Sequence, residues 1–238
     1  MQHLQSFALF EARASGTLNP KQHAFLDRYT LGTWSVNPAT GLVDVQGSFH
    51  CSGRRLKSLV GIQFGTVTVD FECDDNQLTS LVGAPQTVGR SFFCGDNQLT
   101  SLVGAPQTVG GGFYCYHNLL TSLAGAPETV EGDFWCGNNQ LTSLIGAPKT
   151  IKGGFKCYSN QLISLIGAPQ TVGESFYCGN NLLTSLAGAP QTVRRYFYCD
   201  AFHLKPGEWN LAGWLQVLRE GNPAARRLIL TLPAFDAQ

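Results

Sequence analysis

The spacing of the cysteines constrains this chain more than any other feature of its sequence. The eight cysteines are separated by one step of 22 residues and then by six steps of 21 residues. They are Cys51, Cys73, Cys94, Cys115, Cys136, Cys157, Cys178 and Cys199. A fixed period in this range is typical of a repeat protein, in which each repeat forms one coil of the chain. Because one such coil cannot bury an apolar interior by itself, the coils must stack on one another.

Each repeat places the same apolar residues at the same distances from its cysteine. A phenylalanine lies two residues before each cysteine and a leucine lies five residues after it. Phenylalanine and cysteine two residues apart share one face of a strand, so the residue between them lies on the opposite face. A glycine ten residues and a proline twelve residues after the cysteine oppose a helix in the return segment. A valine or isoleucine then precedes the next strand. The sequence therefore predicts a half-buried strand and a compact turn in every coil.

This pattern resembles leucine-rich repeats, whose core reads L-x-x-L-x-L-x-x-N-x-L, with phenylalanine and cysteine in place of the two strand leucines. Six repeats carry an asparagine at the family's position: Asn76, Asn97, Asn118, Asn139, Asn160 and Asn181. The resemblance implies that each asparagine amide bonds backbone groups of neighbouring coils. It implies a repeat solenoid of eight coils, mainly β, with a concave parallel β-sheet and short helical caps.

Two further resemblances concern the amino-acid motif of the repeat. The motif NQLTSL resembles the compact repeats of bacterial effectors. Those effectors act as ubiquitin ligases through a long separate catalytic domain, for which the residues after Asp200 leave no room. The longer motif F-x-C-x-x-N-Q-L-T-S-L-x-G-A-P-Q-T-V is similar to uncharacterised phage and bacterial repeat proteins. These resemblances imply a fold more than a function.

The residues outside the repeats predict caps at both ends. We expect an N-terminal arm and cap over residues 1–46, the solenoid over 47–200 and a C-terminal helical cap over 201–238. Asn19 followed by Pro20 signals the start of a helix that runs through about Tyr29. Segments 34–36 and 42–45 predict a hairpin, and segments 208–220 and 223–230 predict two short helices. Arg54 and Phe202 replace the asparagine in the first and last repeats, as expected of atypical end coils.

Charge and hydropathy exclude several classes of partner. Lys plus Arg and Asp plus Glu both total 16, so no net field attracts nucleic acid or an anionic membrane. No run approaches the roughly 20 apolar residues of a membrane span. The N-terminus lacks the charged start and small-residue cleavage site of a secretory signal. We expect a cytoplasmic protein of a bacterial or phage-infected cell, or a virion protein, and we expect no nucleic-acid or membrane partner.

The same spacing argues against a metal site and against disulfides. Cysteines in successive coils would lie in a line about 4.8 Å apart, which is the distance between adjacent strands. Zinc needs four converging ligands, and a disulfide needs Cβ atoms nearer to about 3.8 Å with suitable torsions. We therefore predict buried, reduced cysteines and no metal. Outside the repeat pattern we find no nucleophile with a base, no carboxylate pair and no phosphate loop, so we predict no catalysis and no cofactor.

The outward-facing strand positions vary, and they carry the functional prediction. Between phenylalanine and cysteine the repeats hold His50, Glu72, Phe93, Tyr114, Trp135, Lys156, Tyr177 and Tyr198. One place beyond the cysteine lie Tyr116 and Tyr158. Exposed aromatic patches mark binding sites. We therefore predict a protein partner bound by Phe93, Tyr114, Tyr116, Trp135, Tyr158, Tyr177 and Tyr198. One alternative is a glycan ligand; another is that the aromatics only stack across coils and stabilise the sheet.

The opening sequence MQHLQSFALFEARASG is not part of the repeat. It resembles the capsid-targeting peptides of internal proteins in large tailed phages, which end in leucine or isoleucine, any residue, then glutamate. Leu9, Phe10 and Glu11 match that ending. The resemblance implies cleavage after Glu11 and, as an alternative function, a virion-associated or packaged structural protein. The other interpretation is an amphipathic arm that packs on the first coil.

Overall fold

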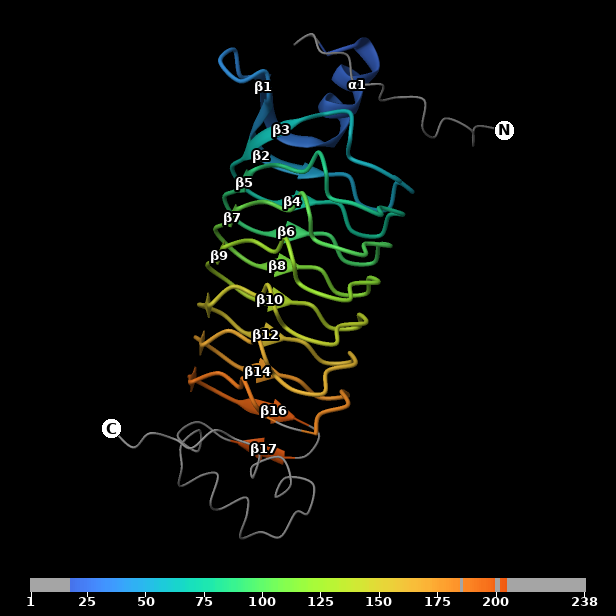
Figure 1. Ribbon diagram of the computed structural model, residues 1–238. Helices are drawn as coiled ribbons and strands as arrows, with labels where there is room; N and C mark the ends of the chain where they lie inside the picture. Colours follow the sequence, from blue (N-terminus) through green and yellow to red (C-terminus); the bar gives the residue numbers. More distant parts are fainter. Residues whose placement is uncertain (1–17, 185, 200–201, 205–238) are drawn as a thin grey trace.

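The computed structural model describes residues 18–184, 186–199 and 202–204. These residues form a parallel β-solenoid whose coils stack into a column with little curvature (Figure 1). Two sets of parallel strands run along the column, and a short corner joins them in each coil. The stack makes about seven turns, and the repeat solenoid predicted from the cysteine period is confirmed.

The first set, the phenylalanine ladder, contains the strands predicted around the phenylalanines. They are β2 (Val43–His50), β4 (Phe71–Glu72), β6 (Phe92–Phe93), β8 (Phe113–Tyr114), β10 (Phe134–Trp135), β12 (Phe155–Lys156), β14 (Phe176–Tyr177) and β16 (Phe197–Cys199). Neighbouring strands pair in register, with phenylalanine opposite phenylalanine. Register is therefore set by the repeat itself, because a slip of one residue would expose every phenylalanine.

The second set, the valine ladder, lies in the return segment, where we expected only a turn. Its strands are β3 (Phe64–Val67), β5 (Thr87–Val88), β7 (Thr108–Val109), β9 (Thr129–Val130), β11 (Thr150–Ile151), β13 (Thr171–Val172) and β15 (Thr192–Val193). Here threonine pairs with threonine and faces outward, while the valine or isoleucine is buried. Two-residue strands exist because each backbone finds its partners in the coils before and after it.

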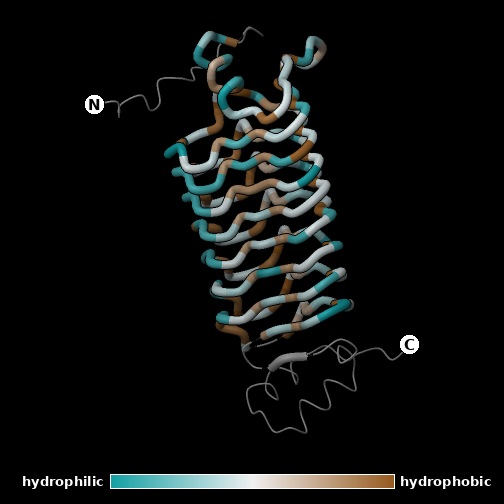
Figure 2. The backbone as a smooth tube through the Cα atoms, turned by 180° about the vertical axis from the view of Figure 1, so that it is seen from behind, coloured by the Kyte–Doolittle hydropathy of each residue, from teal (hydrophilic) through white to brown (hydrophobic). Residues whose placement is uncertain are grey.

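The core is one continuous stack of repeated residues. The phenylalanine, the cysteine and the valine or isoleucine of each repeat are buried, together with most of the repeat leucines. Between Phe49 and Phe197, the ring centroids of successive phenylalanines lie 5.2 to 5.4 Å apart. Apolar and polar segments accordingly recur at the same places in successive coils (Figure 2). Burial of this stack is the main source of stability, because no single coil has an interior of its own.

The asparagines join neighbouring coils, as the resemblance implied. The Oδ1 atom of Asn97 accepts a hydrogen bond from the Leu78 amide of the preceding coil at 2.9 Å. Its Nδ2 atom donates to the carbonyl oxygens of Cys73, Cys94 and Gly95 at 3.0, 3.3 and 2.9 Å. The residue before each asparagine is left-handed, and Asp96 has φ of 50°. Asparagine is required because it supplies one acceptor and two donors where a strand becomes a turn.

The N-terminal cap agrees with its predicted elements. Helix α1 (Pro20–Tyr29) starts at Asn19, whose side chain accepts the Lys21 and Gln22 amides, and the Gln22 side chain completes a capping box. Strand β1 (Thr30–Val36) pairs antiparallel with β2 in a hairpin longer than predicted. The Phe25 ring lies 5.7 Å from the Phe49 ring, so α1 packs on this end of the core.

The C-terminal cap is described only where the chain leaves the last coil. Strand β17 (Phe202–Leu204) pairs antiparallel with β16 at the start of the region 201–238. The predicted helices over 208–220 and 223–230 lie outside the described residues, as does Glu11. In the described part of the chain, no helix is both long enough and apolar enough to cross a membrane.

Candidate interaction surface

The eight residues between phenylalanine and cysteine form one row along the outside of the phenylalanine ladder, the outer row. It runs through His50, Glu72, Phe93, Tyr114, Trp135, Lys156, Tyr177 and Tyr198. Strand pairing places each of these residues beside its counterpart in the next coil. The predicted partner-binding residues of this row are therefore neighbours in space.

The middle of the outer row is a set of rings in contact. The Phe93 and Tyr114 rings stack with centroids 4.6 Å apart and planes 8° apart. The Tyr114 ring then meets the Trp135 ring edge to face at 5.1 Å. The Lys156 Nζ atom lies 3.5 Å from the Trp135 ring centroid and 5.7 Å from the Tyr177 ring centroid. Lys156 therefore covers Trp135 in a cation–π contact and links it to Tyr177.

Tyr116 and Tyr158 occupy a second column, one residue beyond the cysteine. In this column glycine and tyrosine alternate from Gly95 through Gly179. A Cβ atom added to Gly95 would lie 2.7 Å from the Tyr116 ring, and one added to Gly137 would lie 2.9 Å from the Tyr158 ring. Each tyrosine therefore lies across the glycine of the preceding coil. The sequence shows the alternation, but only the structure shows which coil's glycine each tyrosine ring covers.

Tyr116 also reaches the outer row, since its ring centroid lies 6.4 Å from that of Trp135. Phe93, Tyr114, Tyr116 and Trp135 thus form one aromatic cluster, which extends over three strands of the ladder. Further along the same flank lie Tyr158, Tyr177 and Tyr198. The ring centroids of Tyr177 and Tyr198 are 6.1 Å apart. The structure therefore brings the predicted residues to one flank, with their density greatest around Trp135.

The cluster is less exposed than the sequence suggested. Its members are half-buried, and Tyr198, 39% exposed, is the most open residue of the outer row. Burial raises the pKa of Tyr114 and of Tyr116, with smaller contributions from nearby carboxylates. The Trp135 Nε1 atom is buried and has no hydrogen-bond partner among the described residues. Because neighbouring rings lie at strand spacing, they cover one another's faces, and ring edges remain for a partner.

Two ionisable residues lie at the N-terminal end of the outer row. The His50 Nε2 atom lies 3.3 Å from a Glu72 carboxylate oxygen. Burial raises the pKa of Glu72, and the neighbouring His50 opposes that shift. Strand pairing places Glu72 beside Phe93 and Lys156 beside Trp135. The aromatic cluster therefore has an acidic residue at one end and a basic residue at the other.

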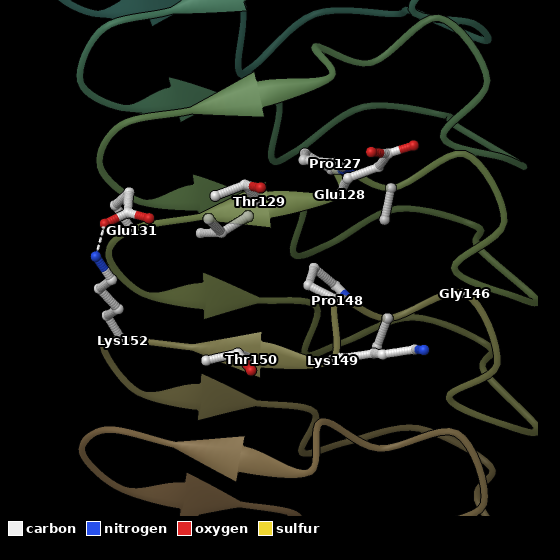
Figure 3. A pocket seen from close by; sticks show the side chains of 12 residues that line it. Pro127, Glu128, Thr129, Glu131, Gly146, Pro148, Lys149, Thr150 and Lys152 are labelled. Carbon is white, nitrogen blue, oxygen red and sulfur yellow. Dashed lines mark ion pairs between the residues drawn. The ribbon is translucent and has the colours of Figure 1, made fainter.

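A different surface, on the valine ladder, was not singled out by the sequence. A shallow groove of about 440 Å³ crosses β9 and β11, and acidic and basic side chains line it (Figure 3). Glu128 and Glu131 flank β9, whereas Lys149 and Lys152 flank β11. Lys152 forms an ion pair with Glu131. The most exposed large apolar residues also lie away from the outer row, and Ile145 is 61% exposed.

The cysteines are buried free thiols, as predicted. Burial raises the pKa of the thiols of Cys73, Cys94 and Cys136 well above the ordinary range. The Cys73 Sγ atom donates to the Phe93 carbonyl oxygen at 3.2 Å. Within the described ranges, His, Cys, Asp and Glu side chains form no group of three or more that could hold a metal ion. The thiols are therefore placed as packing residues.

The chain matches no protein-family model, no curated protein and no solved structure. The geometry of these surfaces is therefore the basis for proposing a function.

Proposed function

We propose that the protein is a non-catalytic scaffold that binds a protein partner through the outer row. The observation that carries this proposal is the grouping of Phe93, Tyr114 and Trp135 in consecutive coils at positions where the fold also accepts charge. His50, Glu72 and Lys156 occupy the same position in other coils. Folding therefore does not require aromatic residues there, whereas the inward phenylalanines recur in every coil.

The packing of the aromatic cluster suits a binding surface. Tyrosine and tryptophan are the usual anchors of protein interfaces, because they combine large apolar area with a polar edge. Contacts among Tyr114, Trp135 and Lys156 hold these side chains in place before a partner arrives. A pre-ordered surface loses less side-chain entropy on binding, so more of the contact energy contributes to affinity.

The same packing favours a protein partner over a glycan. A sugar ring stacks on an open aromatic face. Here the Phe93 and Tyr114 faces cover each other, and Lys156 covers Trp135. Ring edges and the half-exposed Tyr198 remain, and these suit the mixed polar and apolar contacts of a protein interface. The buried free thiols further favour a reducing compartment such as the cytoplasm.

A pull-down from bacterial lysate tests the proposal. Wild-type protein is compared with the double variant Tyr114→Ala, Trp135→Ala. Gln98→Ala, an exposed change outside both ladders, serves as the control. The control should recover the same proteins as the wild type, and the double variant should lose at least one of them. Circular dichroism establishes that all three proteins are folded. Equal recovery by the double variant would remove the aromatic cluster from the binding argument.

The second candidate function is a packaged virion protein, supported by the Leu9-Phe10-Glu11 ending and by the repeat's similarity to phage proteins. N-terminal sequencing of the protein from infected cells and from particles tests it. Particle-derived protein should begin at Ala12, while the cytoplasmic pool begins at residue 1. Absence from particles, or an uncut terminus in them, would contradict this candidate.

A further inference from the structure

Two neighbouring coils of the valine ladder carry charged residues at two positions where most other coils carry glutamine or glycine. The position before the outward threonine holds Gln86, Gln107, Gln170 and Gln191 in other coils, but Glu128 and Lys149 in these two. The position after the buried valine or isoleucine holds Gly89, Gly110 and Gly173 in three other coils and Arg194 after β15, but Glu131 and Lys152 here. Both substitutions are acidic on one coil and basic on the next (Figure 3).

These charges are not explained by stability within one chain. The Glu131 and Lys152 side chains are 38% and 65% exposed, and such surface pairs contribute little to folding. Glu128 and Lys149, at the other end of the two strands, form no ion pair with each other in the described part of the chain (Figure 3). The grooved surface of the valine ladder thus presents an acidic row beside a basic row.

That arrangement is complementary to itself. A two-fold axis parallel to the strands, passing between β9 and β11, exchanges the two coils and preserves position along the strand. It would set Glu128 against Lys149 of a second copy and Glu131 against Lys152 of that copy. The outward Thr129 and Thr150 would face each other across the same axis. A two-fold contact of this kind uses one surface on both copies, so each pairing occurs twice.

The corner beside this surface is apolar in every coil. The residue between the last leucine of the repeat and its glycine is Val60, Val82, Val103, Ala124, Ile145, Ile166 or Ala187. Val103, Ile145 and Ile166 are 58, 61 and 52% exposed. The same two-fold axis would place the small Ala124 opposite Ile145, and Val103 opposite Ile166. Exposed apolar rows of this kind mark protein contacts.

The size of the surface and its other charges are compatible with a dimer. Seven strands about 4.8 Å apart, with about six residues of about 3.3 Å each, define an area on the order of 600 Å². Stable interfaces use about 800 Å² per partner. Arg90 and Arg195 would face each other across the axis, but each already has an acidic partner, Asp70 at 3.9 Å and Glu174 at 3.6 Å.

We infer that the outward surface of the valine ladder, with its apolar corner, is a self-association surface on which a second copy of this chain binds in two-fold symmetry. The interaction is independent of the aromatic cluster, which lies on the phenylalanine ladder. Charge complementarity selects the copy and its direction, and the apolar corner supplies desolvation energy.

Charge reversal with rescue tests the inference. One variant carries Glu128→Lys and Glu131→Lys, so that its surface is wholly basic; the other carries Lys149→Glu and Lys152→Glu and is wholly acidic. All four positions are exposed, so both variants should fold, which circular dichroism verifies. Sedimentation equilibrium should give the wild type twice the 25.7 kDa mass of one chain at micromolar concentration. Each variant alone should dimerise at least tenfold more weakly.

An equimolar mixture of the two variants should recover the dimer, because every reversed pair is then complementary. A monomeric wild type, an undiminished dimer in either variant, or a mixture that stays monomeric would overturn the inference. Trp135→Ala serves as the control and should leave the wild-type mass unchanged. This control separates failure of the dimer from failure of partner binding at the outer row.

Discussion

Replacing one buried asparagine tests the junction between coils. We choose Asn97→Ala, with Gln98→Ala as the matched control. The two residues are adjacent in one coil and carry the same amide group. Asn97 is 9% exposed and bonded to the preceding coil, whereas Gln98 is exposed. Any general effect of losing an amide side chain should therefore appear equally in both variants.

The structure sets the expected magnitude. Without Asn97, the Cys73 and Cys94 carbonyls retain the amides of Asn76 and Asn118, both at 3.0 Å. The Gly95 carbonyl likewise retains the Asp75 amide at 3.2 Å. The Leu78 amide, by contrast, loses the acceptor 2.9 Å away and stays buried. One unsatisfied buried donor costs about 1–3 kcal/mol, and the weakened carbonyl bonds add to this. We expect a total loss of about 3 kcal/mol.

Urea unfolding followed by circular dichroism measures both variants against the wild type. Gln98→Ala should lie within about 0.5 kcal/mol of the wild type, as exposed substitutions usually do. Asn97→Ala should lower the unfolding midpoint clearly, without a change in the spectrum of the folded protein. If the two variants unfold at the same urea concentration, the asparagines do not hold the coils together, and the hydrogen-bond argument is wrong.

Three further outcomes follow from the core and the outer columns. All eight thiols should react slowly with a thiol reagent in the folded protein and completely in denaturant without reductant. Fast reaction in the folded protein, or fewer than eight reactive thiols in denaturant, would contradict this assignment. Phe134→Ala removes a ring whose centroid lies 5.3 and 5.4 Å from those of its two neighbours. It should lower the free energy of unfolding, measured in urea, by about 3–5 kcal/mol. A decrease below about 1 kcal/mol would count against a continuous stack. Gly95→Ala should cost about 1–3 kcal/mol in the wild type and almost nothing in a Tyr116→Ala background, because its Cβ atom meets that ring. Equal cost in both backgrounds would mean that the ring does not lie on the glycine.

The inward half of the fold was predictable because each buried position repeats. Phe134 and Cys136 share one strand face by simple alternation, and Asn139 follows where the strand ends. The strand Thr129–Val130 was not predicted, because proline and glycine nearby are typical of turns. Its backbone partners lie 21 residues away in each direction, and only stacking brings them into reach.

The candidate site was predictable in position but not in exposure. Alternation places Tyr114 and Trp135 on the outside of one ladder, as found. How far each ring is covered depends on side-chain torsions and on the neighbour in the next coil, so the contact of Lys156 with Trp135 could not be foreseen. The charges of Glu128 and Lys149 were visible in the sequence, but only the strands of the valine ladder showed that both residues line one groove.

The central claim is that inward residues specify the fold while the outer aromatics are free to bind, and Trp135→Ala tests it most directly. The measurement is paired: thermal stability, and affinity per folded molecule for the protein recovered by the wild type. Trp135 is half-buried between Tyr114 and Lys156, and contacts of this kind contribute about 1–2 kcal/mol. We predict a small drop in the melting temperature and at least tenfold weaker binding, since about 1.4 kcal/mol at the interface suffices for that factor. A large drop in the melting temperature with unchanged affinity would show instead that the aromatic row only stabilises the sheet.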